Sequence, residues 1–123
     1  EQFIWELFPD KPEEAYIEYF NKDFTELFLP FNKLSNIPAL AFGNLSQLKY
    51  LYLHGNNLTN IPDSIGKLTG LKYLYLHNNK LINIPDSIGK LSQLKELYLG
   101  YNNLSKQEQE KIKKLLPSTT IIF

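Results

Sequence analysis

Two histidines and two serines carry the side chains of this chain that could take part in metal binding or nucleophilic catalysis. His54 and His77 lie in two nearly identical strings, YLYLHGNNL at 50–58 and YLYLHNNKL at 73–81. A zinc site needs three or four ligands, and no Asp, Glu or Cys accompanies the histidines at the same place in these strings. The chain has no cysteine, which excludes thiolate ligands, disulfides and cysteine nucleophiles. We therefore predict no metal site and no cofactor.

Ser64 and Ser87 would need a neighbouring base to act as nucleophiles. Each lies in the segment IPDSIGK, which follows the histidine string and is expected on the opposite side of the fold. The segment also lacks the glycine spacing of a phosphate-binding loop and the hydroxyl residue that follows its lysine. The sequence therefore predicts that the protein is not an enzyme.

An internal repeat must position these residues, together with the tyrosines that surround the histidines. Four windows align, FTELFLPFNKLSNIP from Phe24, LKYLYLHGNNLTNIP from Leu48, LKYLYLHNNKLINIP from Leu71 and LKELYLGYNNLS from Leu94. Their starts are 24, 23 and 23 residues apart, and a fixed period of this length indicates a solenoid.

The windows read LxxLxLxxNxLxxIP, and this pattern resembles that of the leucine-rich repeat family over residues 24 to about 104. With the IGxL segments the chain is most similar to bacterial repeats of 23 residues, and NNLSKQEQEKIKKLLPSTTIIF resembles the helix-plus-strand ending of small bacterial members. The resemblance implies an α/β fold, namely a right-handed solenoid with a parallel concave β-sheet and caps that contain helices. It also implies a role in binding proteins, in a bacterial protein that we expect to be secreted or at the cell surface.

The leucines and asparagines support this fold without the family name. Side chains alternate along a strand, so leucines two residues apart must share one face. We expect the following leucines to point inward: Leu27, Leu29, Leu51, Leu53, Leu74, Leu76, Leu97 and Leu99. At the turn after each strand, an amide can satisfy buried backbone donors and acceptors alike. This predicts a ladder formed by Asn32, Asn56, Asn79 and Asn102.

Both ends of a solenoid need covers, and we divide the chain into an N-terminal cap at 1–23, repeats at 24–104 and a C-terminal cap at 105–123. The N-terminal cap is expected to contain a helix that begins near Pro12. A capping box of Ser105 and Glu108 predicts the C-terminal helix, which Pro117 ends. The closing STTIIF is predicted as a last strand with Ile121 and Phe123 inward.

Residues that alternate with the leucines must face the hollow side of the sheet, where aromatic side chains gather. Aromatics on adjacent strands stabilise a sheet with or without a ligand, but Tyr is also enriched at the centres of protein interfaces. We predict a partner-binding surface made of Phe28, Tyr50, Tyr52, His54, Tyr73, Tyr75, His77, Glu96, Tyr98 and Tyr101. Lys49, Lys72 and Lys95 follow one margin of this surface.

The charges and the apolar runs exclude other partners. The 13 basic residues are all lysines and balance 13 acidic residues, so there is no arginine for bidentate base or phosphate contacts and no nucleic-acid partner is predicted. No apolar run is long enough to span a membrane.

The hollow side of the predicted sheet is small for a binding surface. It offers roughly 400 Å², about half of what each partner buries in a standard interface. An alternative to partner binding is therefore a self-associating structural protein, a homodimer formed through a strand edge, the caps or the concave face.

Overall fold

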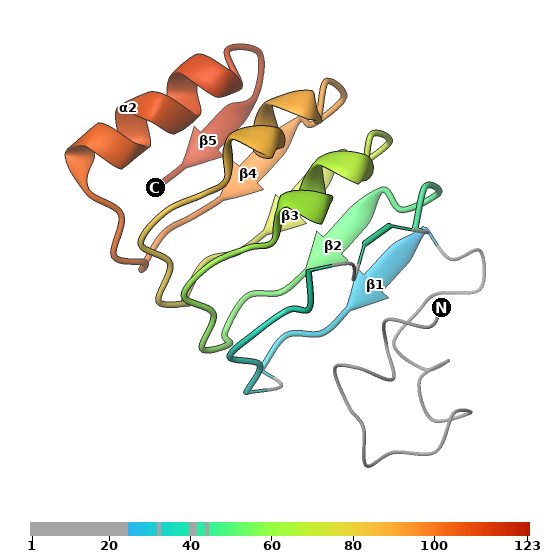
Figure 1. The fold of residues 1–123 in the computed structure, drawn as a ribbon, viewed down its shortest axis with the longest axis horizontal. Helices are drawn as coiled ribbons and strands as arrows, with labels where there is room; N and C mark the ends of the chain where they lie inside the picture. Colours follow the sequence, from blue (N-terminus) through green and yellow to red (C-terminus); the bar gives the residue numbers. More distant parts are fainter. Residues whose placement is uncertain (1–24, 32, 40–41, 44) are drawn as a thin grey trace.

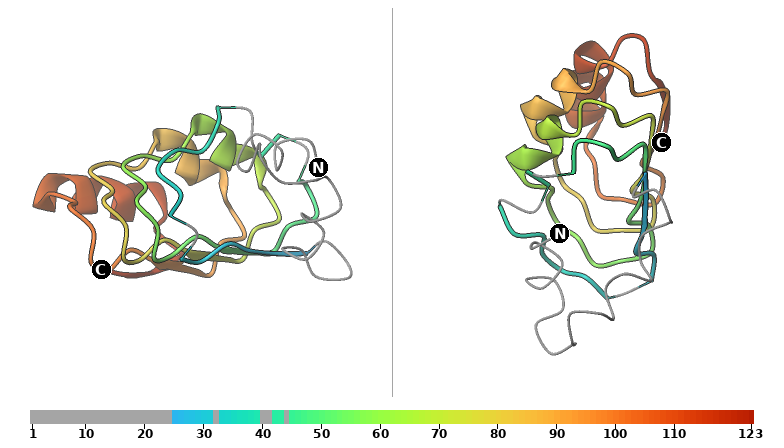
Figure 2. Two further views of the ribbon diagram at one scale, coloured as in Figure 1. Left: turned by 90° about the horizontal axis from the view of Figure 1, so that it is seen from below. Right: turned by 90° about the vertical axis from the view of Figure 1, so that its right-hand side faces the viewer.

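The computed structural model describes residues 25–31, 33–39, 42–43 and 45–123. Five short parallel strands, β1 (Glu26–Phe28), β2 (Tyr50–Tyr52), β3 (Tyr73–Tyr75), β4 (Glu96–Tyr98) and β5 (Thr120–Ile122), form one sheet in chain order. The 3₁₀ helices η2 (Asp63–Lys67) and η3 (Asp86–Lys90) and the α-helix α2 (Lys106–Leu115) form the opposite layer (Figures 1 and 2). This is the predicted leucine-rich repeat solenoid. The predicted N-terminal cap at 1–23 lies outside the described residues.

The core lies between the two layers and runs from coil to coil. All eight leucines that were predicted to point inward are buried, and the strands pair in the register that stacks them, as in Leu51 with Leu74. Burial of one such side chain contributes about 1.5–3 kcal/mol, and each coil depends on its neighbours for that burial. Pro62 and Pro85 directly precede η2 and η3, where the fixed φ of proline suits the flank of a short helix.

The asparagine ladder is confirmed for the three asparagines that the structure describes, since Asn32 lies outside them. The Oδ1 atom of Asn79 accepts from the backbone N–H of Leu58 at 3.0 Å. Its Nδ2 atom donates to the carbonyls of Leu53 at 3.0 Å and Leu76 at 3.1 Å. Asn56 and Asn102 make the equivalent bonds one coil earlier and one coil later. Each amide therefore ties two successive turns together.

The residue before each ladder asparagine adopts a left-handed backbone conformation, a feature that our sequence reasoning missed. The φ angles are 55° at Phe31, 71° at Gly55, 58° at Asn78 and 57° at Tyr101. Glycine and asparagine tolerate this region, whereas an aromatic residue there costs roughly 1–2 kcal/mol. Gly55 and Asn78 at equivalent places were the available signal. The two aromatic residues are 71% and 87% exposed, so burial does not offset their backbone strain.

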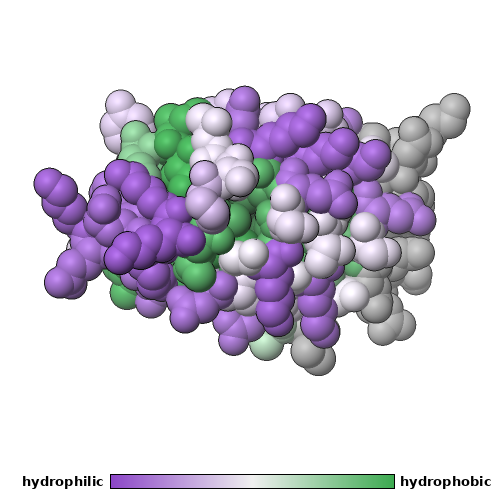
Figure 3. All heavy atoms as spheres, turned by 90° about the horizontal axis from the view of Figure 1, so that it is seen from above, coloured by the Kyte–Doolittle hydropathy of each residue, from purple (hydrophilic) through white to green (hydrophobic). Residues whose placement is uncertain are grey.

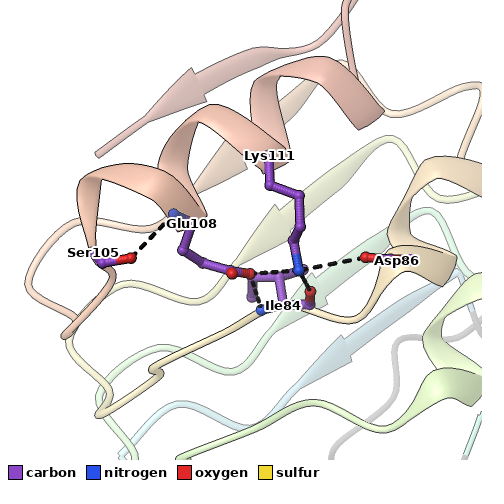
Figure 4. Close-up of polar contacts among 5 residues, drawn as sticks. All are labelled: Ile84, Asp86, Ser105, Glu108 and Lys111. Atoms are coloured by element: carbon purple, nitrogen blue, oxygen red, sulfur yellow. Dashed lines mark hydrogen bonds and ion pairs between the residues drawn. The ribbon is translucent and has the colours of Figure 1, made fainter.

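The C-terminal cap is attached through side chains that reach back to the third coil. The hydroxyl of Ser105 accepts from the Glu108 N–H at 3.1 Å, as the capping box predicts. The Glu108 carboxylate instead accepts from the Ile84 N–H and from Lys111 Nζ, both at 2.8 Å. Lys111 also donates to the Ile84 carbonyl at 2.8 Å and lies 3.4 Å from the Asp86 carboxylate (Figure 4). These contacts fix α2 against the convex backbone.

The last strand is only partly as predicted. Ile121 pairs in register with Leu97 and packs against the core. The prediction that Phe123 points into the core is wrong, because β5 ends at Ile122 and 39% of the Phe123 side chain remains exposed. β5 is an edge of the sheet, and within the described residues no further coil covers this position. Lys113 Nζ lies 5.8 Å from the centre of the Phe123 ring instead.

Candidate functional site

The outward side chains of the strands form three rows across the sheet, which we call the concave face. In the first row, Glu26, Tyr50, Tyr73 and Glu96 pair in register from β1 to β4. In the second row, Phe28, Tyr52, Tyr75 and Tyr98 do the same. The third row holds His54 and His77, just beyond β2 and β3. Nine of the ten residues of the predicted surface therefore lie together, and the tenth, Tyr101, lies at the margin with its side chain almost fully exposed.

The tyrosine rings stack on one another rather than lying open to solvent. The ring centres of Tyr52 and Tyr75 are 4.6 Å apart with planes 3° from parallel, and those of Tyr75 and Tyr98 are 4.9 Å apart at 14°. Tyr50 and Tyr73 stack at 5.1 Å and 4°. Each such pair contributes about 0.5–1.5 kcal/mol beyond burial. The faces of Tyr75 are thus covered on both sides, so the column offers a partner its ring edges and hydroxyl groups.

Two carboxylates anchor two of the three tyrosine hydroxyl groups of the second row. The Tyr52 hydroxyl donates to Glu26 Oε1 at 3.3 Å, and the Tyr98 hydroxyl donates to Glu96 Oε1 at 2.5 Å. Burial, with a smaller contribution from the Glu26 carboxylate, raises the pKa of Tyr52 to about 12. Both phenols therefore remain neutral donors at any physiological pH. Glu26 was not among the ten residues of the predicted binding surface, and its register opposite Tyr50 places it in the first row of the concave face.

The Glu96 carboxylate is the first cause of the high pKa of Tyr98, which is raised to about 12 from 10.0. We expect Glu96→Gln to move the pKa of Tyr98 back toward 10.0, because an amide does not oppose formation of the phenolate. A folded-state pKa above the unfolded value stabilises the fold fully below pH 10.0, and this contribution is lost as the pH rises toward about 12. Tyrosinate absorbance during a pH titration measures the shift. Glu26→Gln is the matched control and should leave Tyr98 unchanged; an unaltered titration in Glu96→Gln would contradict the assignment.

His54 and His77 also stack, with ring centres 4.5 Å apart and planes at 9°. The described residues contain no group of three or more His, Cys, Asp or Glu that could hold a metal ion. Ser64 and Ser87 lie in η2 and η3, in the layer opposite the strands, where they line an open surface depression. Their hydroxyls have no hydrogen-bond partner. The structure therefore brings the histidines together and keeps the serines apart from them.

The helix side differs in character from the concave face. Figure 3 shows hydrophilic side chains over α2 at one end, with an apolar strip beside them. None of the aromatic contacts of the three rows involves a residue of η2, η3 or α2 within the described part of the chain. The aromatic surface is thus confined to the strand side of the solenoid. In addition, no helix in the described part of the chain is both long and apolar enough to cross a membrane.

Comparison with solved structures finds the same fold in bacterial and animal proteins. A leucine-rich repeat protein of Leptospira interrogans matches with a TM-score of 0.78 and 39% identity, over 80% of this chain and 25% of the other. An internalin of Listeria monocytogenes matches with a TM-score of 0.64 and 26% identity, over 85% of this chain and 34% of the other. A chain of the Toll–Spatzle complex of Drosophila matches with a TM-score of 0.63 and 30% identity, over 67% of this chain and 11% of the other.

The chain thus spans a quarter of the length of the Leptospira protein and about a third of the internalin. A search of curated proteins gave no match. Residues 24–81 match the family described as leucine rich repeat, and residues 69–114 match the one described as leucine rich repeats in two copies. These matches, together with the repeated strands, the asparagine ladder and the stacked coils, show that the chain belongs to the leucine-rich repeat family.

Proposed function

We propose that this chain is a non-catalytic protein–protein interaction module that binds a protein or peptide partner through its concave face. The observation that carries the proposal is the pair of stacked tyrosine columns, Tyr50–Tyr73 and Tyr52–Tyr75–Tyr98, on the strand side of the sheet. Leucine-rich repeat folds typically serve as protein–protein interaction modules, and one matched structure is itself a complex. The likeness to a Leptospira protein supports a bacterial source, and we propose that the chain acts at the cell surface or outside the cell.

Stacked tyrosines suit a protein partner for a thermodynamic reason. Binding normally costs about 0.5–1.5 kcal/mol for each side chain that becomes immobilised. In this face the rings are held by their neighbours before any partner arrives, so little of that cost remains. Their ring edges can meet apolar side chains of a partner. The hydroxyl oxygens of Tyr52 and Tyr98, whose O–H groups donate to Glu26 and Glu96, can accept from its N–H groups. Because the groove offers only roughly 400 Å², we include the marginal residue Tyr101 in the surface.

Two variants test the concave face. Tyr52→Ala with Tyr75→Ala removes the centre of the second row and should weaken partner capture at least tenfold, as expected for interface hot spots. Tyr75→Phe removes one hydroxyl and keeps the stack, so it separates hydrogen bonding from packing. Lys67→Ala on the helix side is the matched control. The measurement is affinity capture from bacterial and host extracts, with circular dichroism to check the fold. Unchanged capture by a folded double variant would count against the proposal.

Self-association remains the alternative, and β5 is the feature that favours it. This edge strand carries Ile122 with 41% of its side chain exposed, next to the partly exposed Phe123. An open apolar edge is a template for pairing with a second copy. Light scattering at several protein concentrations decides the matter, because a strict monomer at all concentrations removes this alternative and leaves partner binding untouched.

A further inference from the structure

The third row of the concave face places two titratable rings in close contact. The imidazoles of His54 and His77 stack at 4.5 Å, and Phe31 meets the first of them edge-on at 5.4 Å. Tyr75 of the second row lies beside both histidines, with its ring centre 6.3 Å from that of His54 and 6.4 Å from that of His77. Any movement of the histidines would therefore disturb the tyrosine column that forms the proposed binding surface.

The hydrogen bonding of these two imidazole rings determines which protonation state the fold favours. The Nδ1 atom of each histidine is buried and has no hydrogen-bond partner. A neutral imidazole meets this condition by carrying its proton on Nε2 and leaving Nδ1 as a lone pair. A protonated imidazole carries N–H at both positions, so Nδ1–H would be a buried donor without an acceptor. The site is built for the neutral form.

The groups that face the pair do not compensate for a positive charge. From the turn after β1 the neighbour is Phe31, and from β2, β3 and β4 the neighbours are Tyr52, Tyr75 and Tyr98, all neutral at physiological pH. The two carboxylates of the face, Glu26 and Glu96, lie in the first row and accept hydrogen bonds from Tyr52 and Tyr98. Among the described residues, neither histidine forms an ion pair.

We propose that the stacked His54–His77 pair makes the concave face pH-responsive, closed and ordered when both rings are neutral and opened when acid charges them. This regulation rests on the proposed function, because it concerns the same surface. Two positive charges in adjacent parallel rings repel, and each demands water at a buried Nδ1. The rings must then separate, and Tyr52 and Tyr75 lose their edge-on contacts with the histidines. Release of a bound partner in acid follows.

Acid should destabilise the histidine pair, because both rings have lower pKa values in the folded chain than in the unfolded chain. Burial lowers the pKa of both histidines, and the charge of His77 adds to the effect on His54. The unfolded chain binds protons near 6.5 while the folded chain still resists them. The stability that neutral histidines provide is therefore complete above pH 6.5 and is lost as the pH falls through the folded-state pKa values. A stacked pair should titrate in two coupled steps.

The experiment titrates the isolated chain by proton NMR from about pH 7.5 to about pH 5, the range in which histidine changes charge. In the wild type we expect both imidazole signals to change at pH values below 6.5, together with tyrosine ring signals and near-ultraviolet circular dichroism. His77→Gln should raise the titration midpoint of His54 toward 6.5, because the like charge and the covering ring are gone. The double variant with His54→Gln should lose the acid response of the tyrosines. Two independent midpoints at the ordinary value, or an unchanged acid response in the double variant, would overturn the proposal.

A binding experiment separates this inference from the proposed function. For each protein the readout is the ratio of its own affinities at neutral pH and at about pH 5, because His54 and His77 belong to the binding surface and their replacement can change the neutral-pH affinity itself. The ratio should be at least tenfold for the wild type and no more than about twofold for the double glutamine variant. Equal acid release from both proteins overturns the switch and leaves the concave face as the binding site. If instead the alanine variants of Tyr52 and Tyr75 still bind, the proposed function fails. In that case the NMR titration still tests the pH response of the histidine pair, because it does not depend on a bound partner.

Discussion

Replacement of Asn79 by alanine should lower the free energy of unfolding by about 2–4 kcal/mol. Asn79 is only 7% exposed, and its Oδ1 atom accepts a hydrogen bond from the backbone N–H of Leu58. Alanine leaves that N–H buried without a partner and opens a small cavity. The carbonyls that Asn79 serves each keep a second amide, since Asn56 also donates to Leu53 and Asn102 also donates to Leu76. The loss therefore comes mainly from one orphaned donor.

This sharing of carbonyls predicts non-additive losses along the ladder. In the double variant Asn56→Ala with Asn79→Ala, the Leu53 carbonyl loses both of its amide donors. The double variant should thus be destabilised by about 1 kcal/mol more than the two single variants together. Urea denaturation of the four proteins in this cycle measures the coupling. Asn78→Gly is the control, because Asn78 is exposed and glycine accepts its left-handed conformation. A loss in Asn79→Ala no larger than in this control would contradict the ladder account.

The parts of the fold that follow from periodicity could be predicted from the sequence. Leucines two apart had to be buried together, and an amide after each strand had to serve the turn, so Leu51, Leu53 and Asn56 were placed correctly. The columns of the concave face follow from the same alternation. These features depend only on the repeat length and on the pleat of a strand.

Features that depend on contacts between distant side chains could not be predicted. The parallel stacking of Tyr52 on Tyr75 depends on rotamers that the whole row selects. The Glu108 carboxylate meets the Ile84 N–H across 24 positions of the chain, while the capping-box pattern describes only its own turn. In each case the local pattern gave no information on the partner that decides the geometry.

The second large effect on stability is expected where the convex 3₁₀ helices η2 and η3 pack against each other. A Cβ atom at Gly66 would lie 2.8 Å from the Ser87 carbonyl oxygen and 2.9 Å from its Cβ, so η2 and η3 would have to move apart. We expect Gly66→Ala to lower the free energy of unfolding by about 1–3 kcal/mol, the usual cost of overpacking. Gly89 occupies the equivalent position one coil later, where the nearest atoms belong to Leu115 at 3.4 Å.

Gly89→Ala is therefore the matched control, with the same chemical change at the same place in the repeat. It should be neutral or stabilising by up to about 1 kcal/mol, because alanine restricts the unfolded chain and fits an ordinary van der Waals contact. Thermal and urea denaturation of both variants test the opposite signs. Equal stability of the two would mean that the coils can separate at η2 without loss. In that case, close contact between the 3₁₀ helices would not be what sets the distance between neighbouring coils, and the strand pairing and the asparagine ladder would set it alone.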